Sequence, residues 1–156
     1  MKNVTIYTDG ACSINPGPGG YGAVLFYKGN KKEVSCGYRL TTNNRMELLA
    51  VIRGLEMLKE PCIVDLYSDS KYVIDAINKK WVYGWEKKKW QKSPTEKRIN
   101  YDLWIRLLEL LKIHQVNFIW VRGHAGNVYN ERCDFLATQA VRGKELLTDE
   151  HYESSN

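Results

Sequence analysis

The 156-residue sequence contains no apolar run long enough to span a membrane and no signal-peptide pattern in its first residues. We therefore expect a cytoplasmic protein that does not enter a membrane. Repeats, linkers and low-complexity tracts are also absent. The length and ordinary composition suit one folded domain with a sizeable core.

Cysteine is scarce and has no metal-binding pattern. The four cysteines are widely spaced and form no CxxC pair (Cys12, Cys36, Cys62 and Cys133). This spacing argues against a zinc site or a disulfide framework and favours small, free, buried or half-buried thiols.

The charge is uneven along the chain. The formal net charge is +5. Residues 81–98, WVYGWEKKKWQKSPTEKR, hold six Lys or Arg against two Glu, so most of the excess lies in one segment. A charge run alone is usually a solvated surface. Interleaving with tryptophans makes a polyanionic partner the better interpretation.

Hydrophobic periodicity predicts an alternating order of strands and helices. Three strands are predicted at 3–12, 22–29 and 32–40, with the loop INPGPGG after the first and a Gly-Asn turn at 29–30 between the last two. There follow a helix at 44–59, a strand at 62–69, helices at 70–81 and 100–112, a strand at 116–121 and a helix at 132–143. This order predicts an α/β fold in which an antiparallel meander and two parallel strands form a five-stranded mixed sheet with helices on both faces. The polar tail, residues 144–156, is expected to fray outside a domain that spans 1–143.

Four carboxylates lie where these elements meet. Asp9 stands at the end of the first strand, Asp69 at the end of the fourth, Glu47 at the start of the helix between them, and Asp134 in the last helix. If the two strands are parallel neighbours, their carboxyl ends share one edge of the sheet, where ligands bind in open α/β sheets. Clustered carboxylates repel one another without a cation, and oxygen ligands suit Mg²⁺ or Mn²⁺.

Each carboxylate also has an ordinary structural interpretation. Asp9 could be a turn residue before a glycine, and Asp69 could cap the following helix. Asn44 and Glu47 have capping-box spacing. Asp134 could be a first-turn residue favoured by the helix dipole. Only the convergence of all four at one end of the fold favours a metal site.

Five stretches resemble type 1 ribonuclease H of the bacterial kind, in family order and at family spacing over about residues 3–142. They are YTDGACSINPGPGGYGAVL, TTNNRMELLA, YSDSKYV, WVYGWEKKKW and WVRGHAGNVYNERCDFLA. The resemblance implies the ribonuclease H-like fold and hydrolysis of the RNA strand of an RNA–DNA hybrid, with 5′-phosphate and 3′-hydroxyl products. It implies a monomer in which Asp9, Glu47, Asp69 and Asp134 hold two Mg²⁺ ions, with Mn²⁺ as a substitute. His124, in RGHAGN, would shuttle a proton or assist product release.

The resemblance also implies a substrate surface on both strands. The residues expected to reach the RNA strand are Gly10, Cys12, Asn15, Asn43 and Lys71, where family members often carry Gln. The residues of the basic segment expected to meet the DNA strand are Trp81, Trp85, Lys87, Lys88 and Lys89. The two rings could instead pack on each other or on Trp90.

One position departs from the family pattern. Some members hold a DNA phosphate with an Arg seven residues before the metal-binding Glu, together with a Thr and an Asn. Here that position is Leu40, and the adjacent Arg39 is expected to point to the other face. Thr42 and Asn100 are retained, although Asn100 could simply cap the helix that follows it. We expect a weaker or rearranged phosphate pocket.

Two other functions are compatible with the fold. A catalytically silent domain could bind hybrids or double-stranded RNA, but it would gain nothing from keeping four repelling carboxylates. Another nuclease of the same fold, such as a resolvase or transposase, would lack the basic segment and the HAG loop.

Overall fold

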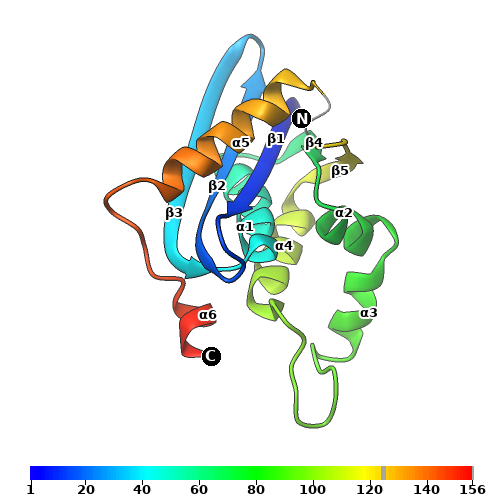
Figure 1. The fold of residues 1–156 in the computed structure, drawn as a ribbon. Coiled ribbons are helices and arrows are strands. Elements are labelled where there is room, and N and C mark those ends of the chain that lie inside the picture. Colours follow the sequence, from blue (N-terminus) through cyan, green and yellow to red (C-terminus); the bar gives the residue numbers. More distant parts are fainter. Residues whose placement is uncertain (124–125, 156) are drawn as a thin grey trace.

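The computed structural model describes residues 1–123 and 126–155. The strands in this part of the chain are β1 (Lys2–Cys12), β2 (Gly17–Tyr27), β3 (Asn30–Thr41), β4 (Cys62–Ser68) and β5 (Gln115–Trp120). The helices are α1 (Asn43–Glu56), α2 (Lys71–Asn78), α3 (Trp81–Lys87), α4 (Tyr101–Ile113), α5 (Val128–Val141) and α6 (Glu150–Ser154). Figure 1 shows their arrangement.

The described strands form one sheet in the order β3-β2-β1-β4-β5. The pairs β1–β2 and β2–β3 are antiparallel, and β1–β4 and β4–β5 are parallel. The predicted meander and two parallel strands are therefore confirmed. The parallel pairing also places the carboxyl ends of β1 and β4 at the same edge, as the carboxylate argument required.

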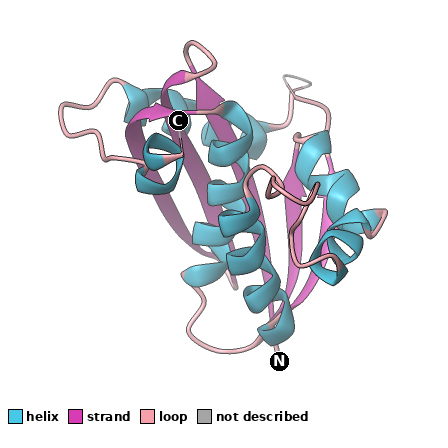
Figure 2. Ribbon diagram, turned by 90° about the horizontal axis from the view of Figure 1, so that it is seen from below, coloured by secondary structure: helices cyan, strands magenta, loops and turns pink. Residues whose placement is uncertain are grey.

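Helices cover both faces of the sheet (Figures 1 and 2). On one face α1 packs against β1 and β2 and also contacts α4, while α2 packs on β4 and β5. On the other face α5 crosses β1, β2 and β3. The main core lies on the α1 side, where fully buried Ile6, Leu48, Ile52 and Leu66 meet.

Strand β2 begins five residues before the predicted start, inside the glycine-rich loop. The reason is its contact with α5, because a side chain at Gly20 or Gly22 would collide with the backbone of that helix. Glycine, usually a strand breaker, here permits close packing. The turn between β2 and β3 is formed by Lys28 and Gly29, both with positive φ, one residue before the predicted position.

The C-terminal tail does not fray, and this prediction was wrong. Leu147 pairs with Tyr38 beside β3, and a short helix, α6, follows. Asp149 is only 5% exposed. The tail folds back because its charged side chains have partners on the domain that lie far away in sequence. The domain boundary at residue 143 stays a prediction.

The remaining expectations from composition concern the cysteines and the membrane. All four cysteines lie in the described ranges and are free, two of them buried and two half-buried, as expected. Within the described residues, no helix has the length and apolarity needed to cross a bilayer.

Candidate metal centre and nucleic-acid interface

Asp9 and Asp69 follow neighbouring parallel segments of the sheet. The parallel pairing of β1 with β4 ends at Tyr7 and Tyr67. Asp9 lies two residues beyond that pairing, in a part of β1 that continues only against β2, and Asp69 comes directly after β4. Asp9 is 5% exposed. The two carboxylates therefore emerge together where the β1 and β4 strands separate.

Glu47 reaches the same place from the first turns of α1. The side chain of Thr42 caps this helix by accepting a hydrogen bond from the backbone N–H of Arg45. Glu47 accepts a hydrogen bond from the backbone N–H of Gly10 on β1. The capping-box interpretation of Asn44 and Glu47 was therefore wrong: the carboxylate points to the sheet and not back along its own helix.

The carboxylates of Asp9, Glu47 and Asp69 each offer an oxygen within 4.8 Å of the others. Burial, followed by the charges of Asp69 and Asp134, raises the pKa of Asp9 to about 8. Burial, followed by the charges of Asp9 and Asp69, also raises the pKa of Glu47 well above its ordinary value. Such a cluster is costly to ionise unless a cation joins it, and three hard oxygen donors suit a divalent metal.

The other two predicted catalytic residues are less closely tied to this cluster. Asp134 is half-buried on α5, near enough to raise the pKa of Asp9, but it is not one of the three clustered carboxylates. His124 lies outside the described residues, so its role stays a prediction.

Comparison with known proteins agrees with this geometry. The family model for RNase H matches residues 1–142. The chain belongs to the RNase H family. A protein from Syntrophus aciditrophicus named Ribonuclease H is 58% identical over 152 residues, covering 97% of this chain and 88% of its own. Another of that name, from a Thermoanaerobacter species, is 60% identical over 139 residues, covering 89% and 90%.

The fold is also similar to that of solved RNase H structures. The crystal structure of LC9-RNase H1, described as a type 1 RNase H with the type 2 active-site motif, superposes with a TM-score of 0.83. It is 28% identical, and the match covers 100% of this chain and 82% of that one. As a member of the RNase H family, the chain is a metal-dependent nuclease whose acidic cluster could hold the metal.

The residues predicted to meet the RNA strand come from β1, the loop after it, and the first residues of α1 and α2, the elements that also carry or adjoin the acidic cluster. Gly10 and Cys12 are on β1. Asn15, in the loop after β1, accepts a hydrogen bond from the backbone N–H of Asn43 at 3.1 Å and so joins that loop to α1. Lys71 begins α2, two residues after Asp69, with its ammonium 4.8 Å from the centre of the Trp120 ring. Their contacts with RNA stay predictions.

The basic segment projects from the domain as α3 and the loop after it (Figure 1). Trp85 packs against Trp104 of α4, with ring centres 5.7 Å apart, and the Arg98 guanidinium lies 4.5 Å from the Trp85 ring centre. This packing anchors the segment to α4, a partner that the sequence did not indicate. Trp81 is 49% exposed, and the side chains of Lys87–Lys89 are exposed.

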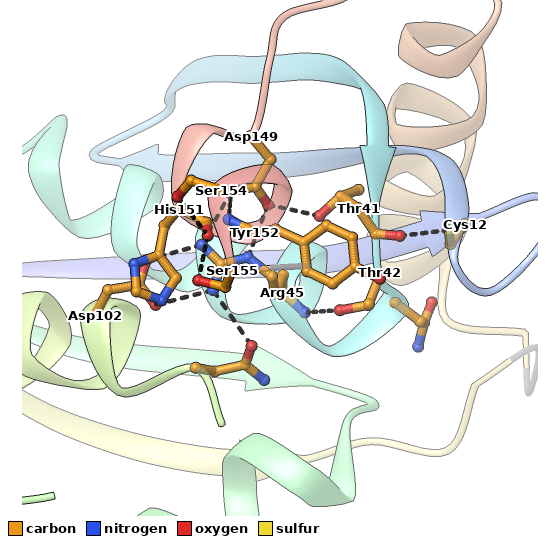
Figure 3. A network of polar contacts seen from close by, with 12 residues as sticks. Cys12, Thr41, Thr42, Arg45, Asp102, Asp149, His151, Tyr152, Ser154 and Ser155 are labelled. Carbon is orange, nitrogen blue, oxygen red and sulfur yellow. Dashed lines mark hydrogen bonds and ion pairs between the residues drawn. The ribbon is translucent and has the colours of Figure 1, made fainter. Parts of the chain in front are cut away.

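Thr42 and Asn100 both bond Arg45, the centre of a polar network that joins α1 to α4. Figure 3 shows this network around Arg45, with Thr42 beside it. Asn100 occupies the N-cap position of α4, as predicted, but its side chain makes no capping hydrogen bond. Its amide instead accepts a hydrogen bond from Arg45 and donates one to the Tyr72 hydroxyl. Leu40 is 38% exposed, and the neighbouring Arg39 pairs with Glu153 of α6.

The centre of this network, Arg45, was missed at the sequence level. Arg45 is 2% exposed, and its guanidinium bonds the carboxylates of both Asp102 and Asp149. Burial by itself raises the pKa of Asp102, but hydrogen bonds from Arg45 together with the charges of Arg45 and His151 hold that pKa below its ordinary value. One signal could have indicated burial: Arg45 lies at helical spacing from buried Leu49 and Ile52. No sequence signal indicated its partners Asp102 and Asp149, which lie 57 and 104 residues away in the chain.

Proposed function

We propose that this protein hydrolyses the RNA strand of RNA–DNA hybrids, with Asp9, Glu47, Asp69 and Asp134 holding two Mg²⁺ ions and with 5′-phosphate and 3′-hydroxyl products. The observation that carries the proposal is the convergence of Asp9, Glu47 and Asp69 within 4.8 Å in a chain of the RNase H family. The fold brings these side chains together from two strands and a helix, so the cluster is held by the whole core.

The donor set fits divalent ions. When bound, a pair of such ions supplies Lewis-acid activation of water and stabilises the leaving oxygen of an in-line phosphoryl displacement. Glu47, fixed by Gly10, and the buried Asp9 provide rigid ligands. Asp69 and Asp134 are half-buried, so they provide ligands nearer the surface that a substrate reaches. The raised pKa of Asp9 means that this ligand must lose a proton when a cation binds near neutral pH.

The rest of the site positions the hybrid. Gly10 donates its backbone N–H to Glu47, and Asn15 is bonded to Asn43 at the start of α1. These groups would meet the 2′-hydroxyls that distinguish RNA. The exposed lysines after α3 would meet phosphates of the DNA strand. His124 would move a proton or assist product release. We further propose that the protein acts as a monomer in the cytoplasm, as expected from its sequence.

A cleavage assay with a labelled hybrid tests the proposal. With Mg²⁺, we expect cutting of the RNA strand of the hybrid, and no cutting of duplex DNA, duplex RNA or single strands. EDTA should abolish cutting, and a parallel titration with Mn²⁺ should compare the two ions. Cutting of duplex DNA would favour another nuclease of the same fold, and hybrid binding without turnover would favour a silent binding domain.

Two aspartate variants, one directly after β4 and one within it, test whether Asp69 is a metal ligand. Asp69→Asn should keep hybrid binding and lose turnover by at least about 100-fold, because it removes one metal ligand. Asp65→Asn, four residues earlier on β4, is the matched control: its carboxylate is exposed and accepts a hydrogen bond from Asn117. It should keep full turnover. Equal turnover of the two variants would contradict the role of Asp69.

A further inference from the structure

The segment 147–155 lies beyond the part of the chain that the RNase H family model matches. Leu147 adds to the edge of β3 through backbone hydrogen bonds with Gly37 and Arg39, both 2.9 Å. Asp149 then caps α6 by accepting a hydrogen bond from the backbone N–H of Tyr152. The segment therefore has a defined position against the domain.

In the network of Figure 3, Nε2 of His151 lies 3.4 Å from the Asp102 carboxylate, and the buried contacts of this segment come from Asp149. Its carboxylate accepts hydrogen bonds from Nε and Nη2 of Arg45 at 2.7 and 3.1 Å, and from the hydroxyl of Thr41 at 2.7 Å. All three residues are buried, with exposed fractions of 5% or less. Charge-assisted contacts of this geometry fix both partners firmly.

These contacts hold two residues next to or bonded to Thr42, the N-cap residue of α1. Thr41 precedes it, and Arg45 donates its backbone N–H to the Thr42 side chain at 3.2 Å. On its other side the Arg45 guanidinium bonds Asn100 at 3.3 Å and makes a two-point pair with Asp102 at 2.8 and 2.9 Å. Asp149 is therefore linked through Arg45 to both residues: the guanidinium bonds Asn100, and the backbone N–H bonds Thr42.

Thr42 and Asn100 face a cavity of about 430 Å³. Arg45 and Lys97 also line it, and the C-terminal segment supplies His151 and Tyr152. Leu40 stands where the family pattern has a phosphate-binding Arg, so a phosphate here depends on the placement of the remaining hydroxyl and amide and on cations such as Lys97. Asp149 contacts neither group directly; it bonds Thr41, which precedes Thr42, and Arg45, which bonds both Thr42 and Asn100.

We propose that Asp149 is a positioning residue for the DNA strand of the hybrid: by holding Thr41 and Arg45, it fixes Thr42 and Asn100 at the wall of this cavity. The inference rests on the proposed function, because it concerns how the same substrate is bound. Asp149 acts through its neighbours and not on the reacting atoms, so its loss should weaken substrate binding and leave the chemical step intact.

Three variants separate positioning from general stability. Asp149→Asn removes the charge that holds Arg45, and Thr41→Val removes only the hydroxyl contact with Asp149. The matched control is Glu153→Gln on the same segment, because Glu153 pairs with Arg39 through exposed contacts outside this network. KM, kcat and hybrid affinity are measured at a temperature at which circular dichroism shows each variant fully folded.

We expect Asp149→Asn to raise KM about 3- to 10-fold with kcat within about twofold of the wild type, since a small misplacement of a binding group costs this much or more. Thr41→Val should shift KM in the same direction by less. Glu153→Gln should change neither constant. If Asp149→Asn does not fold, the comparison of KM between Thr41→Val and Glu153→Gln tests the inference without it.

A hybrid with neutral methylphosphonates placed singly along the DNA strand identifies the contact. In the wild type, one such position should weaken binding several-fold, and in Asp149→Asn the same substitution should cost less, as expected for coupled groups. The inference is overturned if the methylphosphonate weakens binding equally in the wild type and in Asp149→Asn. It is also overturned if KM changes equally in Asp149→Asn and Glu153→Gln. A wild type that neither binds nor cuts any hybrid would instead overturn the proposed function.

Discussion

The carboxylate of Glu47 on α1 accepts a hydrogen bond from the backbone N–H of Gly10 on β1. This contact fixes the start of the helix against the strand that carries Asp9. Glu47 therefore has two roles, joining α1 to β1 and, as proposed, binding a metal ion. A mutation can separate these roles.

Glu47→Gln should keep the fold and lose the activity. A glutamine oxygen can still accept the hydrogen bond from Gly10, whereas the charge that would hold a metal is gone. Without metal the variant should be at least as stable as the wild type, because burial and the neighbouring carboxylates disfavour the ionised form of Glu47. Hybrid cleavage should fall at least about 100-fold.

The measurements are thermal unfolding in EDTA and cleavage of a labelled hybrid in Mg²⁺. Glu109→Gln on the exposed side of α4 is the control for loss of a glutamate and should behave as the wild type. If Glu47→Gln cuts normally, the carboxylate serves only to join α1 to β1.

Gly10→Ala should displace α1 from β1. A methyl group at this position would meet the backbone atoms of Met46 and Glu47, which cannot move aside as a flexible side chain can. We expect a loss of about 1–3 kcal/mol in unfolding free energy, as for other overpacked sites. Cleavage should fall beyond the loss of folded protein, because Glu47 moves with its helix.

Urea unfolding measures the change in unfolding free energy, and a cleavage assay measures the activity of the folded fraction. Gly84→Ala in α3 is the comparison: a methyl group there meets nothing within 4 Å, and alanine favours a helix. That variant should be neutral or stabilised. Equal stability of the two variants would show that α1 yields at Gly10 without cost.

The metal-free protein should lose stability as the pH rises from about 4 to about 8. The pKa of Asp9 is raised to about 8 in the folded state, so the native protein keeps a proton that the unfolded chain releases in this range. Stability from this group is complete at low pH and declines by at most about 1.4 kcal/mol per pH unit until the pKa of about 8 is passed.

Asp9→Asn removes that titration. The stability of the variant minus that of the wild type, measured by urea unfolding in EDTA, should grow with pH and level off above about pH 8. Asp65→Asn controls for loss of an aspartate elsewhere on the sheet. A difference that is constant with pH would show that Asp9 is ionised freely in the folded protein.

Neutralising Lys87, Lys88 and Lys89 to Gln should weaken hybrid binding and flatten its salt dependence. For every phosphate that these lysines no longer bind, the slope of log affinity against log salt should decrease in magnitude by about 0.9. The matched control replaces Lys28, Lys31 and Lys32 at the β2–β3 turn, which lies far from α3 (Figure 1). An identical slope in the two triple variants would exclude the segment after α3 from the interface.

Much of the fold could be predicted from local pattern. The alternating burial along β4 and much of β1 and the helical spacing in α1 and α4 match a hydrophobic pattern that is a local property of the sequence. The early start of β2 could not be predicted, because Gly17, Gly19 and Gly20 have the local pattern of a turn. They belong to the strand through pairing with β1 and β3, and at Gly20 through close packing against α5.

The candidate site was predictable to the extent that it follows from strand order. Parallel pairing of β1 with β4 was enough to bring Asp9 and Asp69 together. The choice between capping and site for Glu47 depended on where Gly10 lies in space, and helical spacing alone favoured neither.

Most of the strands and helices, their order, the acidic and basic residues available for chemistry and the resemblance that names the family could be found in the sequence alone. The position of the C-terminal tail and of α6 depends on tertiary contacts. Asp149 and Arg45 are 104 residues apart, and neither has a local pattern that specifies the other. A buried ion pair requires that both desolvated charges meet in one geometry, and that geometry exists only when β3, α1, α4 and the tail are assembled.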